Sequence, residues 1–304
     1  MKVFVLTGPT GVGKSEVAAT LAQKFDLDII SADSRAIYHH LDIGTAKPSQ
    51  QLRNKVRFHL IDFVEPDRLY SAADFARDAI KVMHELRKAG RRFIIVGGAN
   101  FYLRALFLPL FDAPPVNLTL RKNLQAEPTE TLYQELYSLD PERARQLHHH
   151  DRQRIIRALE VYHLTGKTFS ELTQEQKKAS RFIPVYAILT MERQRLYRRI
   201  EERFDAMLAA GLIDEVRRLK EMGFGQESIV GKTYGYAEVL QYLEGKISFE
   251  AMVQLAKKRT KDYARRQLTW LRSLKEAHWF EFTTLKDVVL KIEPLLLDAL
   301  PDIP

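Results

Sequence analysis

Short apolar runs alternate with helical patterns over the first hundred residues. Helical spacing of apolar positions covers Ser15 to Phe25 and Ser71 to Arg87, and Asp74 completes a near capping box with Ser71. Three apolar runs that are too short for helices, and that end at a Gly or a Ser, predict buried strands at residues 2–7, 27–30 and 92–96. Because strands that alternate with helices pair in parallel, the pattern predicts an α/β fold whose sheet is covered on both faces.

The pattern changes after Phe111, where Pro114 and Pro115 interrupt the chain. The next seventy or so residues have helical spacing, most clearly over 151–164, with hardly any strand candidate. An apolar run at 185–189 then predicts a return to the sheet, followed by helices at 192–210, 212–222, 234–244 and 248–274. The sequence therefore predicts an α/β core built from residues 1–112 and 185–304, and a helical insertion domain over 113–184.

Composition excludes several kinds of chemistry. The chain has 304 residues and no Cys, which rules out disulfide scaffolds, Cys-ligated zinc and thiol nucleophiles. No apolar run approaches the roughly 20 residues of a membrane span, and the N-terminal run is too short for a signal peptide. We therefore expect a soluble, cytoplasmic protein without a membrane partner. Its net charge of +8 favours a polyanionic partner.

A phosphate-binding motif lies between the first predicted strand and the first predicted helix. Residues 8–15 match GxxxxGK[ST] and comprise Gly8, Pro9, Thr10, Gly11, Val12, Gly13, Lys14 and Ser15. Glycines allow backbone N–H groups to turn toward an anion, the helix N-terminus adds partial positive charge, and Lys14 adds a full charge. Ser15 can hold a magnesium ion. The motif predicts binding of a diphosphate, whichever molecule carries it.

An acidic residue follows the second predicted strand and not the third. Nucleotide-hydrolysing phosphate loops usually work with a metal-binding acid on another strand, but the strand at 92–96 ends in Gly97 and Gly98. Asp33 instead follows the strand at 27–30, where the carboxyl ends of parallel strands face a ligand. From the pattern alone, its carboxylate can bind metal, accept a proton or cap the next helix.

The chain resembles the tRNA dimethylallyltransferase family in nine stretches that run in the family's order. They are GPTGVGKS (8–15), SADSRAIY (31–38), DIGTAKP (42–48), HLID (59–62), YSAADFARDA (70–79), GGANFY (97–102), DRQRIIRALEVY (151–162), RIEERFDAML (199–208) and YARRQLTWLR (263–272). The resemblance implies a P-loop kinase-like core with a helical insertion. It also implies transfer of a dimethylallyl group from dimethylallyl diphosphate to N6 of the adenosine 3′-adjacent to the anticodon.

The resemblance implies roles for individual residues. The loop would bind the diphosphate of the donor, and Ser15 would bind Mg²⁺. The side chains of Thr10, Lys14 and Arg203 would act on that diphosphate, and Asp33 would take the proton from N6. The tRNA anticodon stem-loop would be bound by a monomeric enzyme through Asp33, Ser34, Arg35, Ala36, Ala99, Arg121, Gln153, Arg154, Ile155, Ile156, Arg157, Lys232, Thr233, Tyr234, Gly235, Tyr236 and Ala237. The family usually has Gln at position 36 and Thr at 99, so the alanines weaken the contacts expected there.

Other polar and aromatic residues give further expectations. Lys257, Lys261 and Arg265 recur at i, i+4 in a segment with few acids, which predicts a basic stripe for RNA. The arginines at 193, 195, 198 and 199 alternate with Glu192, Glu201 and Glu202, which predicts surface ion pairs. Tyr38 is a candidate for stacking on a base, whereas Trp270 and Trp279 are expected to pack, and His148 to His150 are expected to form a loop without metal.

Three other functions remain open at this point. A small-molecule or nucleotide kinase is suggested by the phosphate loop alone, but no acid ends the strand at 92–96. Prenylation of free AMP or ADP would not need the basic surfaces. An RNA-binding module with an inactive loop is the non-enzyme alternative, and the intact Gly13-Lys14-Ser15 argues against it.

Overall fold

The structure is a computed structural model that describes residues 1–108, 114, 116–175 and 182–300. It divides the chain into two compact units, one made of residues 1–107 and 181–304 and the other of residues 108–180. The first unit begins its second segment earlier than the sequence pattern predicted, because the strand expected at 185–189 already starts at Ile183.

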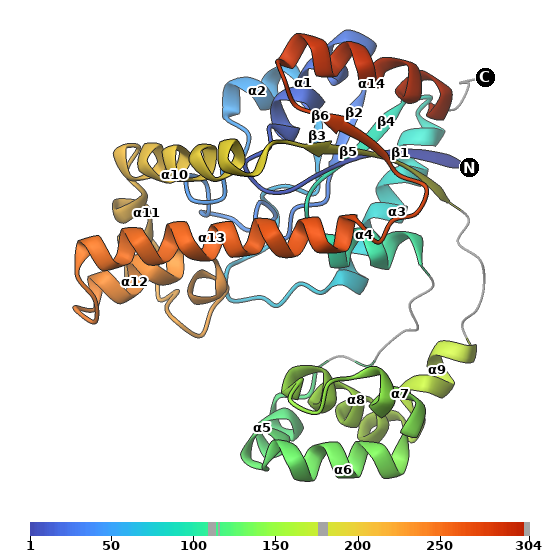
Figure 1. Ribbon diagram of the computed structural model, residues 1–304, viewed down its shortest axis with the longest axis vertical. Coiled ribbons are helices and arrows are strands. Elements are labelled where there is room, and N and C mark those ends of the chain that lie inside the picture. The colour runs from blue at the N-terminus through green and yellow to red at the C-terminus, as the bar shows by residue number, and fades with distance from the viewer. Residues whose placement is uncertain (109–113, 115, 176–181, 301–304) are drawn as a thin grey trace. The chain divides into compact units, whose positions relative to one another are not determined.

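A six-stranded, all-parallel sheet forms the centre of the first unit (Figure 1). Its order is β3-β2-β4-β1-β5-β6, with β1 at Lys2–Thr7, β2 at Asp28–Ser31, β3 at Phe58–His59, β4 at Phe93–Val96, β5 at Ile183–Thr190 and β6 at His278–Glu281. The four central strands are apolar runs that bury both faces, as parallel sheets require. The predicted α/β fold class is therefore confirmed. The edge strands β3 and β6 are short and partly exposed, so they have no apolar run to reveal them.

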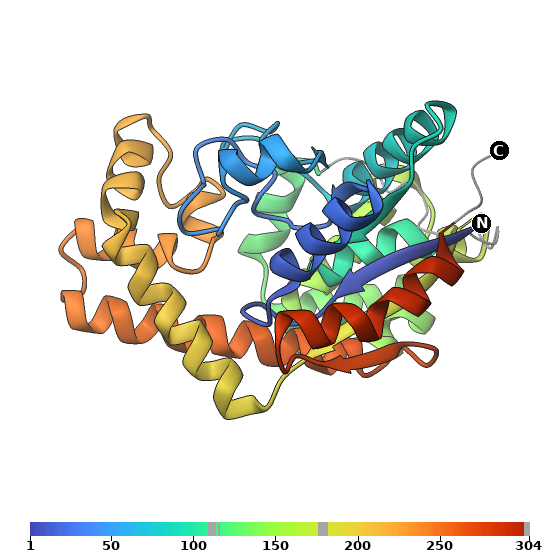
Figure 2. The same ribbon diagram turned by 90° about the horizontal axis from the view of Figure 1, so that it is seen from above.

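Helices cover both faces of the sheet. On one face, α1 (Lys14–Phe25) and α14 (Leu285–Ala299) pack with Phe4 and Leu6 of β1, and Figure 2 shows them side by side. On the other face, α3 (Ala72–Lys88) and α4 (Asn100–Phe107) pack with Val3 and Val5. The alternation of side chains along β1 thus feeds two separate hydrophobic cores. The capping box of Ser71 and Asp74 opens α3, as predicted.

Two long helices extend from the sheet (Figure 1). They are α10 (Arg193–Ala209) and α13 (Phe249–Leu271), which cross and contact each other (Figure 2). At their far end lie α11 (Leu212–Glu221), a 3-10 turn η1 (Val230–Lys232) and α12 (Tyr236–Leu243), and a short α2 (Gln50–Lys55) precedes β3. Their bounds agree with the helices predicted after residue 190 to within a few residues.

The second unit is helical, as its apolar spacing predicted. It contains α5 (Leu118–Ala126), α6 (Thr129–Leu139), α7 (Pro141–Gln146), α8 (Arg152–Thr165) and α9 (Phe169–Glu175). Its own core is formed by leucines of α6 and by Ile155 and Leu159 of α8. Asp140 and Asp151 cap α7 and α8 with their carboxylates, and Gly166 ends α8 in the left-handed conformation. In the ranges that the structure describes, no helix of either unit is long and apolar enough to cross a membrane.

Candidate active site

The phosphate loop joins β1 to α1 in a conformation that only glycine adopts easily. Gly11 and Gly13 have φ of 84° and 102°, and Gly13 is the residue that precedes α1. A Cβ on Gly8 would lie 2.6 Å from the carbonyl oxygen of Leu189 in β5. The loop is therefore pressed against the end of the neighbouring strand, and the first N–H groups of α1 have no acceptor within the helix.

Lys14 lies across this loop. Its Nζ donates to the carbonyl oxygens of Gly8 at 3.0 Å and Pro9 at 2.8 Å. Burial lowers its pKa to about 8, opposed by the Asp33 carboxylate and reinforced by the Arg203 guanidinium. The three predicted catalytic charges thus act on one another, although they come from α1, the turn after β2, and α10.

Thr10 is held from two sides. Arg203 Nη2 donates to its Oγ1 at 2.7 Å, and its own N–H donates to Gln267 Oε1 at 2.8 Å. Gln267 is buried in α13, and its Nε2 donates to the carbonyl oxygen of Gly98 at 2.7 Å. One amide side chain therefore ties the phosphate loop to the end of β4. Sequence reasoning missed Gln267, whose only signal was its place in the RRQLTW stretch.

Gly97 and Gly98 bring β4 close to both parts of the site. A Cβ on Gly97 would lie 2.0 Å from the carbonyl oxygen of Ala32, and one on Gly98 would lie 3.2 Å from that of Gly8. The same Cβ on Gly98 would be 3.5 Å from Lys14 Nζ. Any side chain here would separate the loop from the Asp33 turn, which explains why this strand ends in glycine where a nucleotide-hydrolysing protein has an acid.

Asp33 both caps its turn and faces the cations. Its Oδ1 accepts the N–H of Arg35 at 2.8 Å and of Ala36 at 3.2 Å, so the capping role left open above is present. Its charge opposes the lowering of the pKa of both Lys14 and Arg203, whose dominant cause is burial. The hydrogen bonds that the described residues give to this carboxylate all go to Oδ1. Oδ2 can therefore take a proton without breaking the turn.

Aromatic residues near Asp33 come from α13 and the segment before α12. Burial and then the Asp33 carboxylate raise the pKa of Tyr263 to about 12. Its ring centroid lies 5.7 Å from that of Tyr234, which is 39% exposed and receives a hydrogen bond from Arg266. The two rings lie beside each other with their planes tilted by 49°. Tyr38, the stacking candidate from the sequence, is instead buried in the core, so that prediction is wrong.

The structure separates the predicted RNA-binding residues into exposed and buried ones. Ser34, Arg35, Lys232 and Tyr234 reach the surface, and Arg35 Nη2 donates to the Lys232 carbonyl at 3.3 Å, which joins the Asp33 turn to residues 232–237. The sequence prediction needs correction for the side chains of Ala36, Ala99, Thr233, Tyr236 and Ala237, which are buried and not available to RNA, as is Gly235.

The second unit shows the same division. Gln153 and Arg154 are exposed on the first turn of α8, whereas Ile155 and Ile156 are core residues, and the prediction that they bind RNA is corrected. Arg121 and Arg157 both pair with the fully buried carboxylate of Glu160, at 2.6 and 2.7 Å. Their first role is therefore to hold α5, α8 and the Pro114 carbonyl together. His148 to His150 form the expected loop.

The basic stripe on α13 is paired and not free. Lys257 Nζ lies 2.6 Å from Asp205 and Lys261 Nζ lies 2.6 Å from Glu201, both on α10, and Arg265 pairs with Asp262. Lys257 and Lys261 therefore join α13 to α10, which argues against an RNA contact by these two lysines, whereas Arg265 pairs within α13 and stays largely exposed. Of the arginines on α10, Arg199 forms a surface ion pair as expected, with Glu16, but Arg195 instead donates to the carbonyls of Phe282 and Thr283. Trp270 packs as predicted, but Trp279 is 41% exposed.

Replacing Lys261 by Met is expected to change the free energy of unfolding by no more than about 1 kcal/mol, because its ion pair with Glu201 is partly exposed. The affinity for RNA should stay nearly unchanged, because the Lys261 ammonium is already paired. Urea unfolding and filter binding of RNA at fixed salt measure the two quantities. A fall in RNA affinity much larger than that of the equivalent surface variant Lys258→Met would restore the stripe as an RNA contact.

The fold and the site together define a class: a P-loop α/β protein in which the carboxylate of Asp33 follows the strand next to the loop's own sheet neighbour. Among the described residues, no group of three or more His, Asp or Glu side chains is placed to hold a metal ion. A model of the IPP transferase family matches residues 36–274. The chain belongs to the IPP transferase family.

Individual relatives agree with this assignment. The tRNA dimethylallyltransferase of Thermotoga maritima is 41% identical over 303 residues, covering 98% of this chain and 99% of that protein. The full-length tRNA isopentenylpyrophosphate transferase of Bacillus halodurans superposes with a TM-score of 0.73 at 32% identity, covering 98% and 96% of the two chains. A eukaryotic dimethylallyltransferase acting on tRNA gives a TM-score of 0.84 at 29% identity, covering 98% and 78%.

Proposed function

We propose that this enzyme transfers a dimethylallyl group from dimethylallyl diphosphate to N6 of the adenosine 3′-adjacent to the anticodon of tRNA and releases diphosphate. The observation that supports this reaction best is the position of Asp33, which acts electrostatically on both Lys14 and Arg203 at the phosphate loop. A proton acceptor next to a diphosphate site suits an alkyl transfer in which one group leaves as an anion while another loses a proton.

The phosphate loop acts as a clamp on the leaving group. Breaking the allylic C–O bond leaves negative charge on diphosphate and positive character on carbon. Lys14 and Arg203 both hydrogen-bond to the loop, and the first N–H groups of α1 have no acceptor within the helix. These donors are therefore gathered at one place, where they can stabilise the charge on the diphosphate. Thr10 fixes Arg203 at that loop through its hydroxyl. In a buried setting, preorganised donors of this kind contribute several kcal/mol, on the order of 3 each.

Asp33 receives the proton of the acceptor. The lone pair of an exocyclic adenine amine is delocalised into the ring, so its attack requires loss of a proton as the C–N bond forms. Asp33 Oδ2 is the oxygen for this task, because Oδ1 keeps the N–H groups of Arg35 and Ala36. In this scheme Asp33 takes the proton and the phosphate loop keeps the diphosphate, so two separate groups of one site receive the two products of bond breaking.

The acceptor is the anticodon stem-loop of a tRNA. Its target adenine must be unstacked from the loop, and the rings of Tyr234 and Tyr263 with the Arg266 guanidinium are available to stack on it. Lys232, Gln153 and Arg154, which are exposed, and Arg35, which is partly exposed, are polar groups for the RNA backbone. We expect a monomer that acts in the cytoplasm, where tRNA is found, and a net charge of +8 suits this polyanionic substrate.

Magnesium is the cofactor that these residues fit. Mg²⁺ usually keeps several waters and binds through one or two protein groups plus substrate phosphates, and the exposed Ser15 hydroxyl at the start of α1 is such a group. When bound, the ion would supply further positive charge to the leaving diphosphate. Ser15 would hold it.

The function is tested by incubating the enzyme with Mg²⁺, radiolabelled dimethylallyl diphosphate and an unmodified tRNA that has adenosine next to the anticodon. We expect label in the RNA, at N6 of that adenosine by mass spectrometry of the digested nucleosides. AMP as acceptor and ATP as donor are the comparison arms. Label in AMP but not tRNA, or phosphoryl transfer from ATP to a soluble acceptor, would replace the proposal with nucleotide prenylation or a kinase.

Donor affinity is expected to fall as the pH rises through about 8. Lys14 binds diphosphate in its charged form, burial has already lowered its pKa to about 8, and the second ionisation of a phosphate, with a pKa of about 6, is complete by then. The bound anion raises the pKa of Lys14, so the Kd should rise by up to about tenfold per pH unit above 8. Calorimetric titration from pH 6.5 to 9.5 measures the curve.

The control for this pH series is Lys24→Met. Lys24 lies on the same helix α1 but pairs with Glu293 on α14, so its loss should leave the curve unchanged. Affinity that stays constant from pH 7 to 9.5 in the unaltered enzyme would show that Lys14 does not control donor binding.

A further inference from the structure

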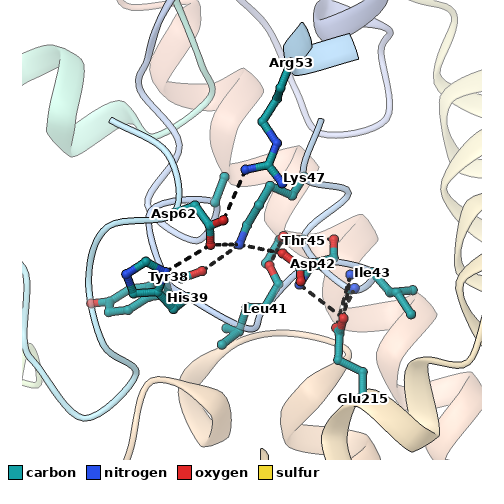
Figure 3. A network of polar contacts seen from close by, with 12 residues as sticks. Tyr38, His39, Leu41, Asp42, Ile43, Thr45, Lys47, Arg53, Asp62 and Glu215 are labelled. Carbon is teal, nitrogen blue, oxygen red and sulfur yellow. Dashed lines mark hydrogen bonds and ion pairs between the residues drawn. The ribbon is translucent and has the colours of Figure 1, made fainter. Parts of the chain in front are cut away.

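A buried carboxylate, Glu215 of α11, organises the DIGTAKP stretch, for which the reaction above gives no role. Its two oxygens accept the N–H groups of Asp42 at 3.2 Å, Ile43 at 2.9 Å and Gly44 at 3.4 Å (Figure 3). It also accepts the hydroxyl of Tyr236 at 2.6 Å. Glu215 is 4% exposed and these partners are neutral, so its charge is compensated by hydrogen bonds.

Tyr236 connects this carboxylate to the segment at 232–237. Its hydroxyl donates to Glu215 and accepts the N–H of Gly44 at 3.1 Å. Burial, and next the Glu215 charge, raise the pKa of Tyr236 well above its usual value, so the hydroxyl keeps its proton. A Cβ on Gly44 would lie 2.3 Å from Tyr236 Cε2. Residues 42–44 therefore fit directly against the start of α12.

Lys47 fixes the other end of the same loop. Its buried Nζ binds Asp42 Oδ1 at 2.7 Å, Asp62 Oδ1 at 2.8 Å and the carbonyl oxygen of Tyr38 at 2.8 Å, and Arg53 also reaches Asp62 (Figure 3). Burial raises the pKa of Asp62, but the hydrogen bonds from Lys47 and Arg53 outweigh it and hold the pKa below its usual value. Asp42 and Asp62 thus both contact the one ammonium group of Lys47.

The contacts continue to the Asp33 turn. The N–H of Asp62 donates to the Ala36 carbonyl at 3.0 Å, and those of Phe63 and Val64 donate to the Ile37 carbonyl. Ala36 in turn donates its N–H to Asp33 Oδ1. Four residues in and near this network have positive φ values, in the left-handed region that residues with a side chain rarely adopt: His40, Ala46, Leu60 and Asp62. Such conformations persist only where surrounding contacts impose them.

We propose that Glu215 is a positioning residue: through residues 42–44 and Tyr236, it fixes the segment at 232–237 relative to the Asp33 turn and so prepares the enzyme for its RNA acceptor. The inference rests on the proposed function. Glu215 is buried and hydrogen-bonds to residues 42–44 and Tyr236, so it acts through them and not directly on a substrate. Because the phosphate loop is held separately by Gln267 and by β5, the donor site does not depend on this network.

The experiment compares Glu215→Gln with Asp214→Asn, a carboxylate-to-amide change at the next residue, whose exposed side chain pairs only with Arg217 among the described residues. An amide at 215 places NH₂ opposite backbone N–H donors. We expect kcat/KM for tRNA to fall by about 10²-fold, with most of the change in KM for RNA, as misplacement of a substrate-binding element does. The Kd for dimethylallyl diphosphate should stay within about twofold, and Asp214→Asn should resemble the unaltered enzyme in both.

Two further measurements keep the outcome clear. Tyr236→Phe removes one hydroxyl from the network and should give the same pattern at smaller size. Hydrogen exchange, which needs no substrate, should show faster exchange of the N–H groups at 42–44 in Glu215→Gln but no change in α1. The inference would be overturned if Glu215→Gln had the same exchange rates at 42–44 or the same kcat/KM as the unaltered enzyme. A parallel loss of affinity for donor and RNA would also overturn it. Failure of the unaltered enzyme to label tRNA would instead overturn the proposed function, while the exchange result would stand.

Discussion

Asp33→Asn is expected to lower kcat for tRNA prenylation by about 10²- to 10⁴-fold while the Kd of dimethylallyl diphosphate stays within about twofold, which is the range for loss of a general base. The amide oxygen can still accept the N–H groups of Arg35 and Ala36, so the turn after β2 keeps its shape. Only the ability to take a proton and the negative charge are lost. Single-turnover kinetics with donor bound first separates the chemical step from RNA binding.

Comparison with Asp33→Ala distinguishes the base from the cap. The alanine variant loses both functions, so it should be as slow as the asparagine variant and should also lose about 1 kcal/mol of unfolding free energy, the usual value of a cap. Normal turnover in Asp33→Asn with a defect only in Asp33→Ala would reduce Asp33 to a structural residue. Loss of donor affinity in both would place it at the diphosphate or its metal.

Features that depend on neighbouring residues in the chain could be predicted from the sequence. The phosphate loop, the four central strands and helices such as α8 each have a local signature: glycine spacing, an apolar run or a 3.6-residue period. The same holds for the Ser71 capping box. Some polar residues of the motif stretches, such as Gln153 and Arg154, are exposed, as a contact with a partner requires.

Features that depend on partners far away in the chain could not be predicted from the sequence. Gln267 contacts Thr10 across 257 positions, and nothing in its own segment marks it as a buried bridge. Lys257 and Lys261 looked like an RNA stripe because their acidic partners lie on α10, 52 and 60 positions away in the chain. One of these partners, Glu201, was assigned instead to neighbouring arginines. Glu160 and Glu215 were missed because a buried carboxylate looks like any surface one until its donors are known. The pattern of charges along the sequence therefore shows where charged residues are, but it does not show which of them pair in the folded protein.

Arg203→Met is expected to lower kcat by about 10²- to 10³-fold, the usual effect of removing one preorganised donor to a developing anion. Arg203 donates to Thr10 Oγ1 at 2.7 Å, and burial lowers its pKa while Asp33 opposes the change. A desolvated cation so placed interacts most strongly when the C–O bond breaks and charge on the diphosphate is largest. Donor affinity should therefore fall much less than kcat, because the bound donor already has Lys14 and the N–H groups of α1.

The matched control is Arg199→Met, one turn earlier on α10. Arg199 pairs with the exposed Glu16 and lies over the Phe282 ring, so it adds positive potential to the site without contacting the loop hydroxyl. Its loss should cost no more than about tenfold, since charges in contact with solvent are screened. Thr10→Val should give an intermediate loss in kcat, because Arg203 keeps its charge but loses the hydroxyl that orients it. Equal rate losses in Arg203→Met and Arg199→Met would mean that net charge alone drives departure of diphosphate, and a loss confined to donor Kd would mean that Arg203 binds the ground state only.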